Sequence, residues 1–273
     1  MQPKKHNDNT SLPKKAIILA GGLGTRLRPL TLTVPKPMID VNGKTLTEHI
    51  LDILKKYEIN EVYLSVSYLG HKIQEYFGNG IRQDGGQKDF GVKINYLNEE
   101  KPMGTAGPLL ILKREKRLQE LNETFVMLNG DNLFSLDFKK MYELHKKNNA
   151  VATIGLTRVE DPSKYGVVRI DNKFNSEKSD KSKNNKDFVK ILEFVEKPKK
   201  ENAPSNLISS GYYILEPEVF DYLPEKDFAM MEKEVWPALA KAGKLFGFIS
   251  DGQWFDTGTM EAYETVKKEW KGV

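Results

Sequence analysis

The first half of the chain alternates two kinds of segment, and this alternation restricts the fold more than any other feature. Short apolar runs lie at residues 16–20, 61–68, 92–97 and 124–131. Amphipathic runs of helical period lie between them, at 45–59, 70–78 and 107–121, and Thr45 and Glu48 have the spacing of a capping box. The order strand, helix, strand predicts βαβ units and a parallel sheet.

After about residue 150 the pattern changes to strands joined by loops. Strands are predicted at 150–159, 165–170, 188–197 and 207–215, and helices near 228–242 and 259–270. The polar, lysine-rich segment 172–187 lies between two of these strands and predicts a long, mobile hairpin loop. Residues 1–14 predict a flexible tail.

Composition and charge exclude several classes of protein. The 273 residues include no cysteine, which excludes disulfides and thiolate metal sites and suits a reducing cytoplasm. No apolar run is long enough for a membrane span. The net charge of +4 lies in two segments, 1–15 and 172–190, which carry +3 each and leave the rest of the chain at −2. We therefore expect a cytoplasmic protein that binds neither membranes nor nucleic acid.

A glycine-rich turn follows the first predicted strand directly. It lacks the third glycine of a dinucleotide-binding fingerprint, because Leu27 stands at that place. The GKT at residues 43–45 lacks the first glycine of a P-loop, because Met38 stands there. What remains is a turn whose backbone N–H groups can approach an anion, followed by Arg26, Arg28 and Lys36. The alternative is an ordinary strand-to-helix turn with solvated basic side chains.

These residues belong to a longer motif. The run LAGGLGTRLRPLTLTVPKPM at 19–38 resembles the signature of the nucleotide-sugar pyrophosphorylases, which are sugar-1-phosphate nucleotidyltransferases. Further landmarks follow in the family's order: GTAG at 104–107, NGD at 129–131, FVEKP at 194–198, SSGYYIL at 209–215 and WFDTGT at 254–259. The resemblance implies an α/β fold of Rossmann-like type, with three α/β/α layers and a mixed, mainly parallel sheet. It also implies one domain at 15–273, with a nucleotide-binding half at 15–150 and a sugar-phosphate-binding half at 151–273.

The implied reaction is attack by a sugar-1-phosphate oxygen on the α-phosphorus of a nucleoside triphosphate, with release of pyrophosphate. Such a transfer depends on positioning and charge neutralisation. By resemblance, Arg26 would bind the triphosphate, Lys36 would orient the reacting phosphates and Lys197 would hold the sugar phosphate. The resemblance also gives nucleotide contacts to Ala20, Gly21, Gly22, Gly24, Thr25, Glu99, Gly104, Thr105 and Asp131. Without that context, each lysine would be assigned to a surface ion pair.

Two aspartates are the candidates for a metal site. Asp131 ends a predicted strand, and Asp256 precedes a predicted helix. The resemblance makes them the pair that binds Mg²⁺, a cation that proteins hold through one or two carboxylates together with substrate phosphates. The alternative for each is an ordinary turn or helix-cap residue.

The sequence says less about which sugar is bound than about which base is bound. The sugar-contacting positions of the family correspond to Tyr165, Gly166, Glu196, Ser210 and Gly211. Many relatives have Asn-Ala-Gly where this chain has Ser-Ser-Gly at 209–211, so the identity of the sugar stays open. Glu99 stands where pyrimidine-using relatives commonly have glutamine. A carboxylate only accepts hydrogen bonds, which favours guanine, with its N1–H and N2–H₂ donors, over uracil or thymine.

The segment GTAGPL at 104–109 resembles mannose-1-phosphate guanylyltransferases, and GTP with mannose 1-phosphate is the favoured pair. A glucose-1-phosphate thymidylyl- or uridylyltransferase is the alternative within the family. The alternative from another class is a catalytically silent regulatory protein that binds a nucleotide-sugar. No hexapeptide repeat of a C-terminal β-helix occurs, so we expect no acyltransfer, and the resemblance is compatible with a homo-oligomer.

Overall fold

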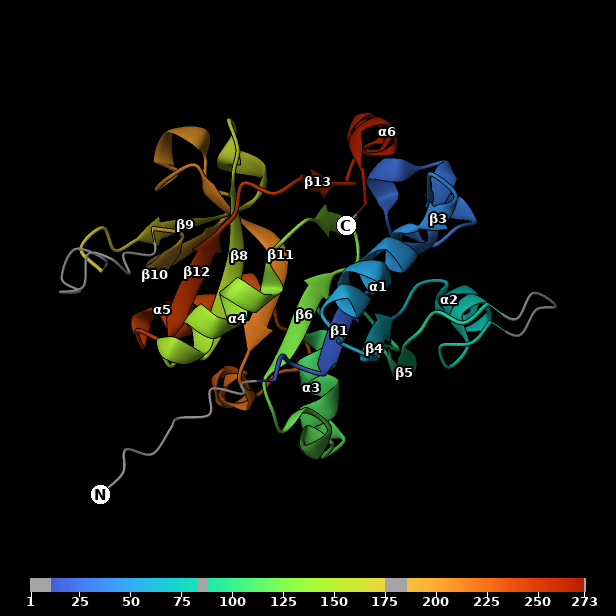
Figure 1. The fold of residues 1–273 in the computed structure, drawn as a ribbon, viewed down its shortest axis with the longest axis horizontal. Coiled ribbons are helices and arrows are strands. Elements are labelled where there is room, and N and C mark those ends of the chain that lie inside the picture. Colours follow the sequence, from blue (N-terminus) through green and yellow to red (C-terminus); the bar gives the residue numbers. More distant parts are fainter. Residues whose placement is uncertain (1–10, 83–87, 175–185, 273) are drawn as a thin grey trace, which may run out of the picture.

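Nine strands form one continuous sheet in the computed structural model, which describes residues 11–82, 88–174 and 186–272 (Figure 1). Their order across the sheet is β5 (Lys93–Asn98), β4 (Glu61–Val66), β1 (Lys15–Leu19), β6 (Phe125–Asn129), β11 (Leu207–Leu215), β8 (Ala152–Arg158), β12 (Leu245–Ile249), β10 (Phe188–Glu196) and β9 (Gly166–Ile170). Outside the described residues lie positions 1–10 of the predicted tail and 175–185 of the predicted loop.

Strand direction confirms the mixed α/β fold. The strands β5, β4, β1 and β6 are parallel, as their βαβ order predicts. β11 is antiparallel to both β6 and β8, and β10 is antiparallel to both β12 and β9. Since β12 runs parallel to β8, only β11 and β10 oppose the other strands of this sheet.

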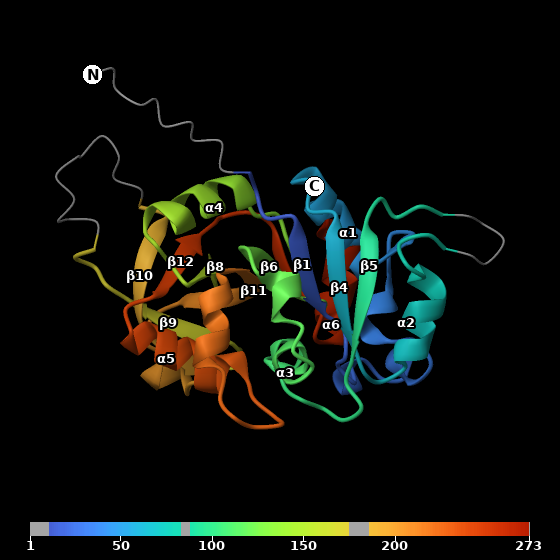
Figure 2. The same cartoon turned by 90° about the horizontal axis from the view of Figure 1, so that it is seen from below.

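Helices cover both faces of the sheet (Figure 2). Consecutive side chains of β1 point to opposite faces of the sheet, and both faces are apolar: Ile18 is buried in one core and Ile17 in the other. The first core also receives side chains from α1 (Leu46–Lys56), α2 (Gly70–Phe77), α4 (Phe138–Lys147) and α6 (Met260–Glu269). The second receives them from α3 (Gly107–Arg114) and α5 (Trp236–Lys241). The described residues thus form three layers, with α6 as the last element.

Two predicted helices are shorter than the sequence pattern indicates. α3 ends at Arg114, and Lys116 has a φ of 56°, a left-handed conformation that stops the helix before a short 3₁₀ turn at Leu118–Leu121. The segment predicted as a helix from 228 has no regular secondary structure at 228–230, Met230 is extended, and helical turns begin only at Met231. Here the backbone of Ala229 pairs with another loop, and that pairing replaces helical hydrogen bonds.

The first turn of α1 supports a loop of the site. The predicted capping box is confirmed: the Glu48 N–H donates to Thr45 Oγ1 at 3.1 Å, and the Thr45 N–H donates to Glu48 Oε2 at 2.7 Å. In the same turn, the buried Thr47 hydroxyl donates to the Pro37 carbonyl oxygen at 3.0 Å. The start of α1 therefore fixes the segment that carries Lys36.

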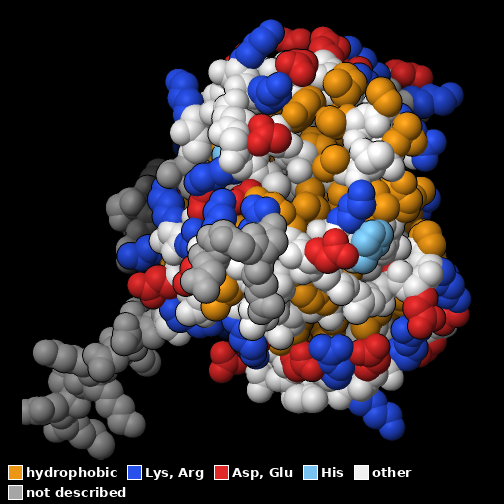
Figure 3. Space-filling view, turned by 90° about the vertical axis from the view of Figure 1, so that its right-hand side faces the viewer, with side chains coloured by type: hydrophobic (Ala, Val, Ile, Leu, Met, Phe, Trp, Pro, Cys, Tyr) orange, Lys and Arg blue, Asp and Glu red, His pale blue; other side chains and the backbone are white. Residues whose placement is uncertain are grey.

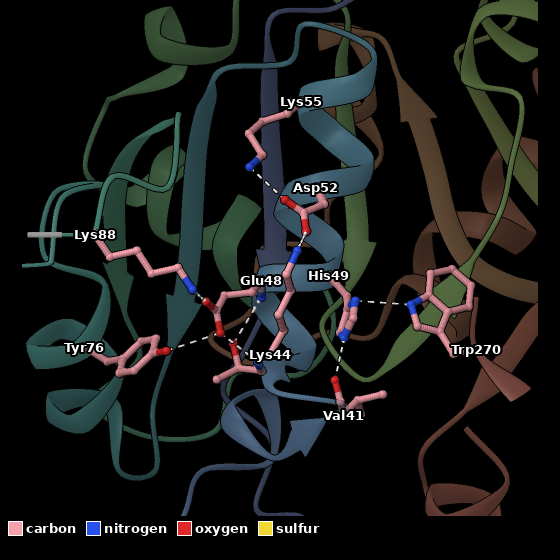
Figure 4. A network of polar contacts seen from close by, with 10 residues as sticks. Val41, Lys44, Glu48, His49, Asp52, Lys55, Tyr76, Lys88 and Trp270 are labelled. Carbon is pink, nitrogen blue, oxygen red and sulfur yellow. Dashed lines mark hydrogen bonds and ion pairs between the residues drawn. The ribbon is translucent and has the colours of Figure 1, made fainter. Parts of the chain in front are cut away.

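Glu48 is also the centre of a polar network (Figure 4). Lys88 forms an ion pair with its carboxylate and Tyr76 donates to it at 3.3 Å. On the neighbouring side of α1, Trp270 Nε1 donates to His49 Nδ1 at 3.2 Å, which ties the end of the described chain to this helix. α1 thus joins three separate parts of the sequence.

Replacing Glu48 with glutamine is expected to reduce the free energy of unfolding by about 1–3 kcal/mol at pH 7. Burial opposes ionisation of Glu48, but hydrogen bonds from Lys88 and Thr45 outweigh it and leave the pKa below the ordinary 4.5. The stabilisation by the ionised Glu48 carboxylate is fully present above pH 4.5 and is lost as the pH falls through the lowered pKa. Urea unfolding at pH 7 and pH 3 measures the difference, which should shrink at pH 3. Glu58→Gln, in an exposed ion pair, is the control with little expected change.

Two surface properties of the described residues bear on membrane and nucleic-acid binding. Of the helices in the described part of the chain, none combines the length and the apolar character that a bilayer crossing needs. On the face shown in Figure 3, basic and acidic side chains are interspersed, and hydrophobic side chains gather in its upper right part. The lysines and arginines visible there form no unbroken patch.

Candidate active site

Two cavities adjoin the carboxyl ends of the central strands. The first cavity has a volume of about 340 Å³ and is lined by Leu19, Gly21, Gly22, Lys36, Pro37, Glu99, Pro102, Gly104, Thr105, Asn129, Gly130, Asp131, Phe228 and Met230. The second cavity, of about 620 Å³, has among its lining residues Arg26, Tyr165, Gly166, Glu196, Lys197, Ser209, Glu232, Trp254 and Asp256. Both are lined by Thr105, Asn129, Asp131 and Met230, so they meet at these residues.

The glycine-rich turn follows β1 and forms one wall of the first cavity. The Ala20 N–H donates to the Ser65 carbonyl oxygen at 2.8 Å, which carries the parallel pairing of β1 and β4 one residue past the strand. Gly21 and Gly22 then line the cavity, whereas Ala20 is buried beneath it. Gly24 and Thr25 are absent from the lining of both cavities.

Lys36 and Asp131 form the ion pair at the meeting point of the two cavities. Lys36 Nζ lies 2.5 Å from Asp131 Oδ2, and the lysine side chain is only 8% exposed. Asp131 follows the end of β6, where ligands of open α/β sheets bind. One of the three ammonium N–H groups is used by Asp131, so Lys36 has donors left for a bound anion.

A small two-stranded sheet brings Asp256 to the same place. β13 (Trp254–Asp256) pairs antiparallel with β7 (Asn132–Phe134), and Asp256 lies opposite Asn132. Thr257 donates to the Asp131 carbonyl oxygen from its N–H at 3.1 Å and from its hydroxyl at 2.7 Å. Thr257, the neighbour of Asp256, therefore holds the backbone of Asp131, so the two carboxylates are fixed relative to each other.

The pKa of Asp256 depends on its burial and on the nearby charges of the site. Burial raises the pKa of the Asp256 carboxyl, the negative charge of Asp131 raises it further, and Lys36 and Arg26 oppose the increase. A Cβ atom on Gly258 would lie 2.9 Å from Asp256 Oδ1 and 3.0 Å from Arg26 Nη2, so the ends of both side chains lie close to this glycine. Arg26 itself is exposed and lines the second cavity.

The two carboxylates fit a hard divalent cation. Asp131 and Asp256 repel each other and offer only oxygen ligands, and a cation between them would offset that repulsion. In residues 11–82, 88–174 and 186–272 no group of three or more His, Cys, Asp or Glu is arranged to hold a metal. Magnesium suits such a site because phosphates and water supply its remaining ligands.

Glu99 lines the first cavity in an orientation fixed by two hydrogen bonds. Ser65 Oγ donates to its Oε1 at 2.7 Å, and the Met103 N–H donates to its Oε2 at 3.1 Å. Each carboxylate oxygen accepts one of these bonds and keeps further acceptor capacity. Glu99 therefore presents a rigid pair of acceptors beside Gly104, as a purine edge with two donors would need.

Residues in and next to β9 and β10 line part of the second cavity. The Lys197 N–H donates to the Tyr165 carbonyl oxygen at 3.0 Å, which places these two residues side by side at the ends of the paired strands. Lys197 Nζ lies 3.0 Å from Glu196 Oε1, and the lysine side chain is exposed. The Tyr165 ring contacts Trp254 edge-on, with 5.4 Å between centroids. The second cavity thus combines a cation, an acceptor and an aromatic wall.

Ser210 and Gly211 lie beside the second cavity, and neither is among its lining residues. The register of β11 shifts between Ser209 and Tyr213. Ser209 lines the cavity, while Ser210 is fully buried and its hydroxyl has no hydrogen-bond partner among the described residues. The Ser210 carbonyl oxygen accepts bonds from Asn132 Nδ2 at 2.9 Å and Trp254 Nε1 at 3.0 Å. Its contribution in this structure is to position those side chains.

Sequence reasoning missed several residues of the two cavities: Asn129, Ser209, Phe228, Met230, Glu232 and Trp254. Glu232 accepts a hydrogen bond from the Thr105 hydroxyl, and burial raises the pKa of its carboxyl. In the sequence it belongs to a predicted amphipathic helix, where a glutamate is unremarkable. For Asn129, Ser209 and Trp254 a signal existed, since each lies within a motif of the resemblance: NGD, SSGYYIL and WFDTGT.

Comparison with known proteins gives matches over nearly the whole chain. The nucleotidyl transferase family profile matches residues 15–271. The mannose-1-phosphate guanylyltransferase catalytic subunit beta of Xenopus tropicalis is 38% identical over 251 residues, which are 92% of this chain and 63% of that protein. The probable mannose-1-phosphate guanylyltransferase 1 of Oryza sativa subsp. japonica is 37% identical over 255 residues, with the same two shares. The chain thus spans less than two thirds of the length of these relatives.

Solved structures show the same fold. A UDP-glucose pyrophosphorylase complexed with UDP-glucose superposes with a TM-score of 0.77 at 24% identity, covering 95% of this chain and 98% of that one. A putative glucose-1-phosphate thymidylyltransferase from Bacillus anthracis superposes with a TM-score of 0.75 at 26% identity, covering 93% and 94%.

Proposed function

Because the chain belongs to the nucleotidyl transferase family, we propose that it joins a nucleoside triphosphate to a sugar 1-phosphate and releases pyrophosphate. The observation that carries this proposal is the meeting of the two cavities at Asp131, between Lys36 and Asp256. The first cavity has the glycine turn for phosphates and Glu99 for a base, and the second has Lys197 and Glu196 for a sugar phosphate. Their shared border is where the two substrates would react.

In the proposed reaction, an oxygen of the sugar phosphate forms a bond to the α-phosphorus as the bond from that phosphorus to the bridging oxygen breaks. The electron pair leaves with pyrophosphate. Lys36, held by Asp131, donates to phosphate oxygens, and Arg26 and Lys197 supply positive charge from the second cavity. Asp131 and Asp256 would hold Mg²⁺, which neutralises phosphate charge.

For the base and the sugar, we propose GTP and mannose 1-phosphate. The acceptor pair of Glu99 supports guanine, because a uracil or thymine edge has a single N–H donor between two carbonyl groups. The names of the relatives at 37–38% identity support both substrates. The alternative pair, glucose 1-phosphate with dTTP or UTP, uses the same phosphate chemistry and differs only at these two contacts.

A substrate panel tests the proposal. The protein is incubated with Mg²⁺, each of GTP, dTTP, UTP and CTP, and either mannose 1-phosphate or glucose 1-phosphate, and pyrophosphate release is measured. We expect kcat/KM for GTP with mannose 1-phosphate to exceed that of every other pair by about tenfold or more, a ratio that hydrogen-bond selectivity readily supplies. Turnover of dTTP without turnover of GTP would contradict the guanine assignment. Binding of a nucleotide-sugar without any pyrophosphate release would instead indicate a silent regulatory protein.

A further inference from the structure

Phe228 is a large aromatic side chain that stays 50% exposed although it lies on the wall of a cavity. Its ring borders the first cavity, which Glu99 and Gly104 also line, and it lies next to Gly104. Exposing an aromatic ring to water is unfavourable, since burial of such a side chain is among the main sources of stability and affinity. The exposed ring on the cavity wall is therefore available to a ligand that enters the cavity, which would gain from covering it.

The backbone around Phe228 is held in place on both sides. The Ala229 N–H donates to the Met103 carbonyl oxygen at 3.0 Å, and the Ala106 N–H donates to the Ala229 carbonyl oxygen at 3.0 Å. Before the ring, Asp227 forms an ion pair with Lys101 at 3.0 Å. The segment is therefore fixed against the loop 101–106 even though it is neither helix nor strand.

Gly104 allows the ring to lie close to this loop. Its φ is 80°, and a Cβ atom there would lie 2.2 Å from the Ala229 carbonyl oxygen and 3.3 Å from Phe228 Cζ. Any side chain at position 104 would push away both the backbone pairing and the ring. The glycine thus keeps the Phe228 ring against the cavity wall.

Met103 joins the ring to the polar end of the same cavity. Its N–H donates to Glu99 Oε2, and its carbonyl oxygen accepts from the Ala229 N–H. One peptide segment therefore sets the position of a hydrogen-bonding carboxylate and of the residue next to an exposed aromatic ring. A flat ligand with polar groups on its edge would contact both.

We infer that the Phe228 ring stacks on the face of the nucleobase whose edge hydrogen-bonds to Glu99. This inference rests on the proposed function. Stacking on an aromatic side chain tolerates any base, but a purine offers a larger face than a pyrimidine. The ring therefore strengthens nucleotide binding in general and favours guanine in the ground state, whereas Glu99 reads the edge.

The test uses the full chain with Phe228→Ala, Phe228→Leu and Phe228→Trp. The control is Leu118→Ala, which removes an apolar side chain of 39% exposure outside both cavities. We expect Phe228→Ala and Phe228→Leu to raise the KM for GTP about tenfold, with kcat changed by less than about twofold. Phe228→Trp should restore KM, and GTP should quench the fluorescence of its new indole beyond the change seen in wild-type protein.

Two results would overturn the inference. One is an unchanged KM for GTP in Phe228→Ala, with an active wild type. The other is a lower oligomer mass in light scattering for Phe228→Ala without any change in GTP binding, which would assign the ring to contact with a second copy of the chain. Failure of the proposed function looks different, because the wild type would then release no pyrophosphate. The fluorescence titration with GTP would still decide whether the ring contacts a base.

Discussion

Replacing Asp131 with asparagine is expected to lower kcat/KM for nucleotidyl transfer about a thousandfold or more, which is about 4 kcal/mol of transition-state stabilisation. Asparagine keeps the shape and a carbonyl acceptor for the buried Lys36, so the substitution removes mainly the negative charge. That charge is half of the proposed Mg²⁺ site, together with Asp256. Initial rates of pyrophosphate release over a range of Mg²⁺ concentrations measure the effect.

The matched control for Asp131 is Asp251→Asn. Asp251 is exposed and absent from the lining of both cavities, so this variant should keep the wild-type rate. Circular dichroism of both variants shows whether either has lost its fold. Near-normal turnover of the Asp131 variant at ordinary Mg²⁺ concentration would mean that the metal is bound elsewhere.

Replacing Asp256 with asparagine is expected to reduce turnover at least about a hundredfold while making the protein more stable by about 1 kcal/mol at pH 7. The pKa of Asp256 is raised by burial and then by the charge of Asp131, so the ionised carboxylate is less favourable in the folded protein than in the unfolded chain. Asparagine removes that penalty and still offers an acceptor to the Gly258 N–H.

The pH dependence of the stability difference between Asp256→Asn and the wild type tests the cause of the expected stabilisation. At a pH well below the ordinary value of 3.8, Asp256 is protonated in both the folded and the unfolded state, so no penalty remains to be removed. Thermal unfolding should therefore show a Tm increase of about 2–4 °C at pH 7 that disappears near pH 3. A decrease in Tm at pH 7 would show that the Asp256 carboxylate stabilises the fold, contrary to the direction of its pKa.

The residues nearest the reaction were predictable because the sequence places them in local motifs. Gly21 and Gly22 follow a recognisable strand, and Asp131 ends another, so strand-end geometry alone suggests that they meet. Asp256 is different. Its position depends on pairing between β13 and β7, two three-residue strands that no periodicity reveals.

Residues that line the cavities through irregular backbone could not be predicted. Alternation along a strand places Ser209 and Ser210 on opposite faces, but it does not tell which of the two faces the cavity, and Gly211 is absent from the lining where the register of β11 shifts. Phe228 lies in a segment whose sequence pattern predicts helix, but it has no regular secondary structure, and the next residue, Ala229, hydrogen-bonds to a loop more than a hundred residues earlier. Tertiary contacts outweighed local propensity there.

Because β7 and β13 form a small sheet of their own, the local stability of the site differs from the global stability of the fold. Three residue pairs join these strands, whereas the main sheet is continuous across nine strands. Local opening of the short ladder costs far less free energy than global unfolding. Separation of β7 from β13 would part the two carboxylates and disturb the edge of the first apolar core, to which both strands contribute side chains. The second core contains no residue of either strand, so a molecule with its main sheet intact can still be temporarily inactive.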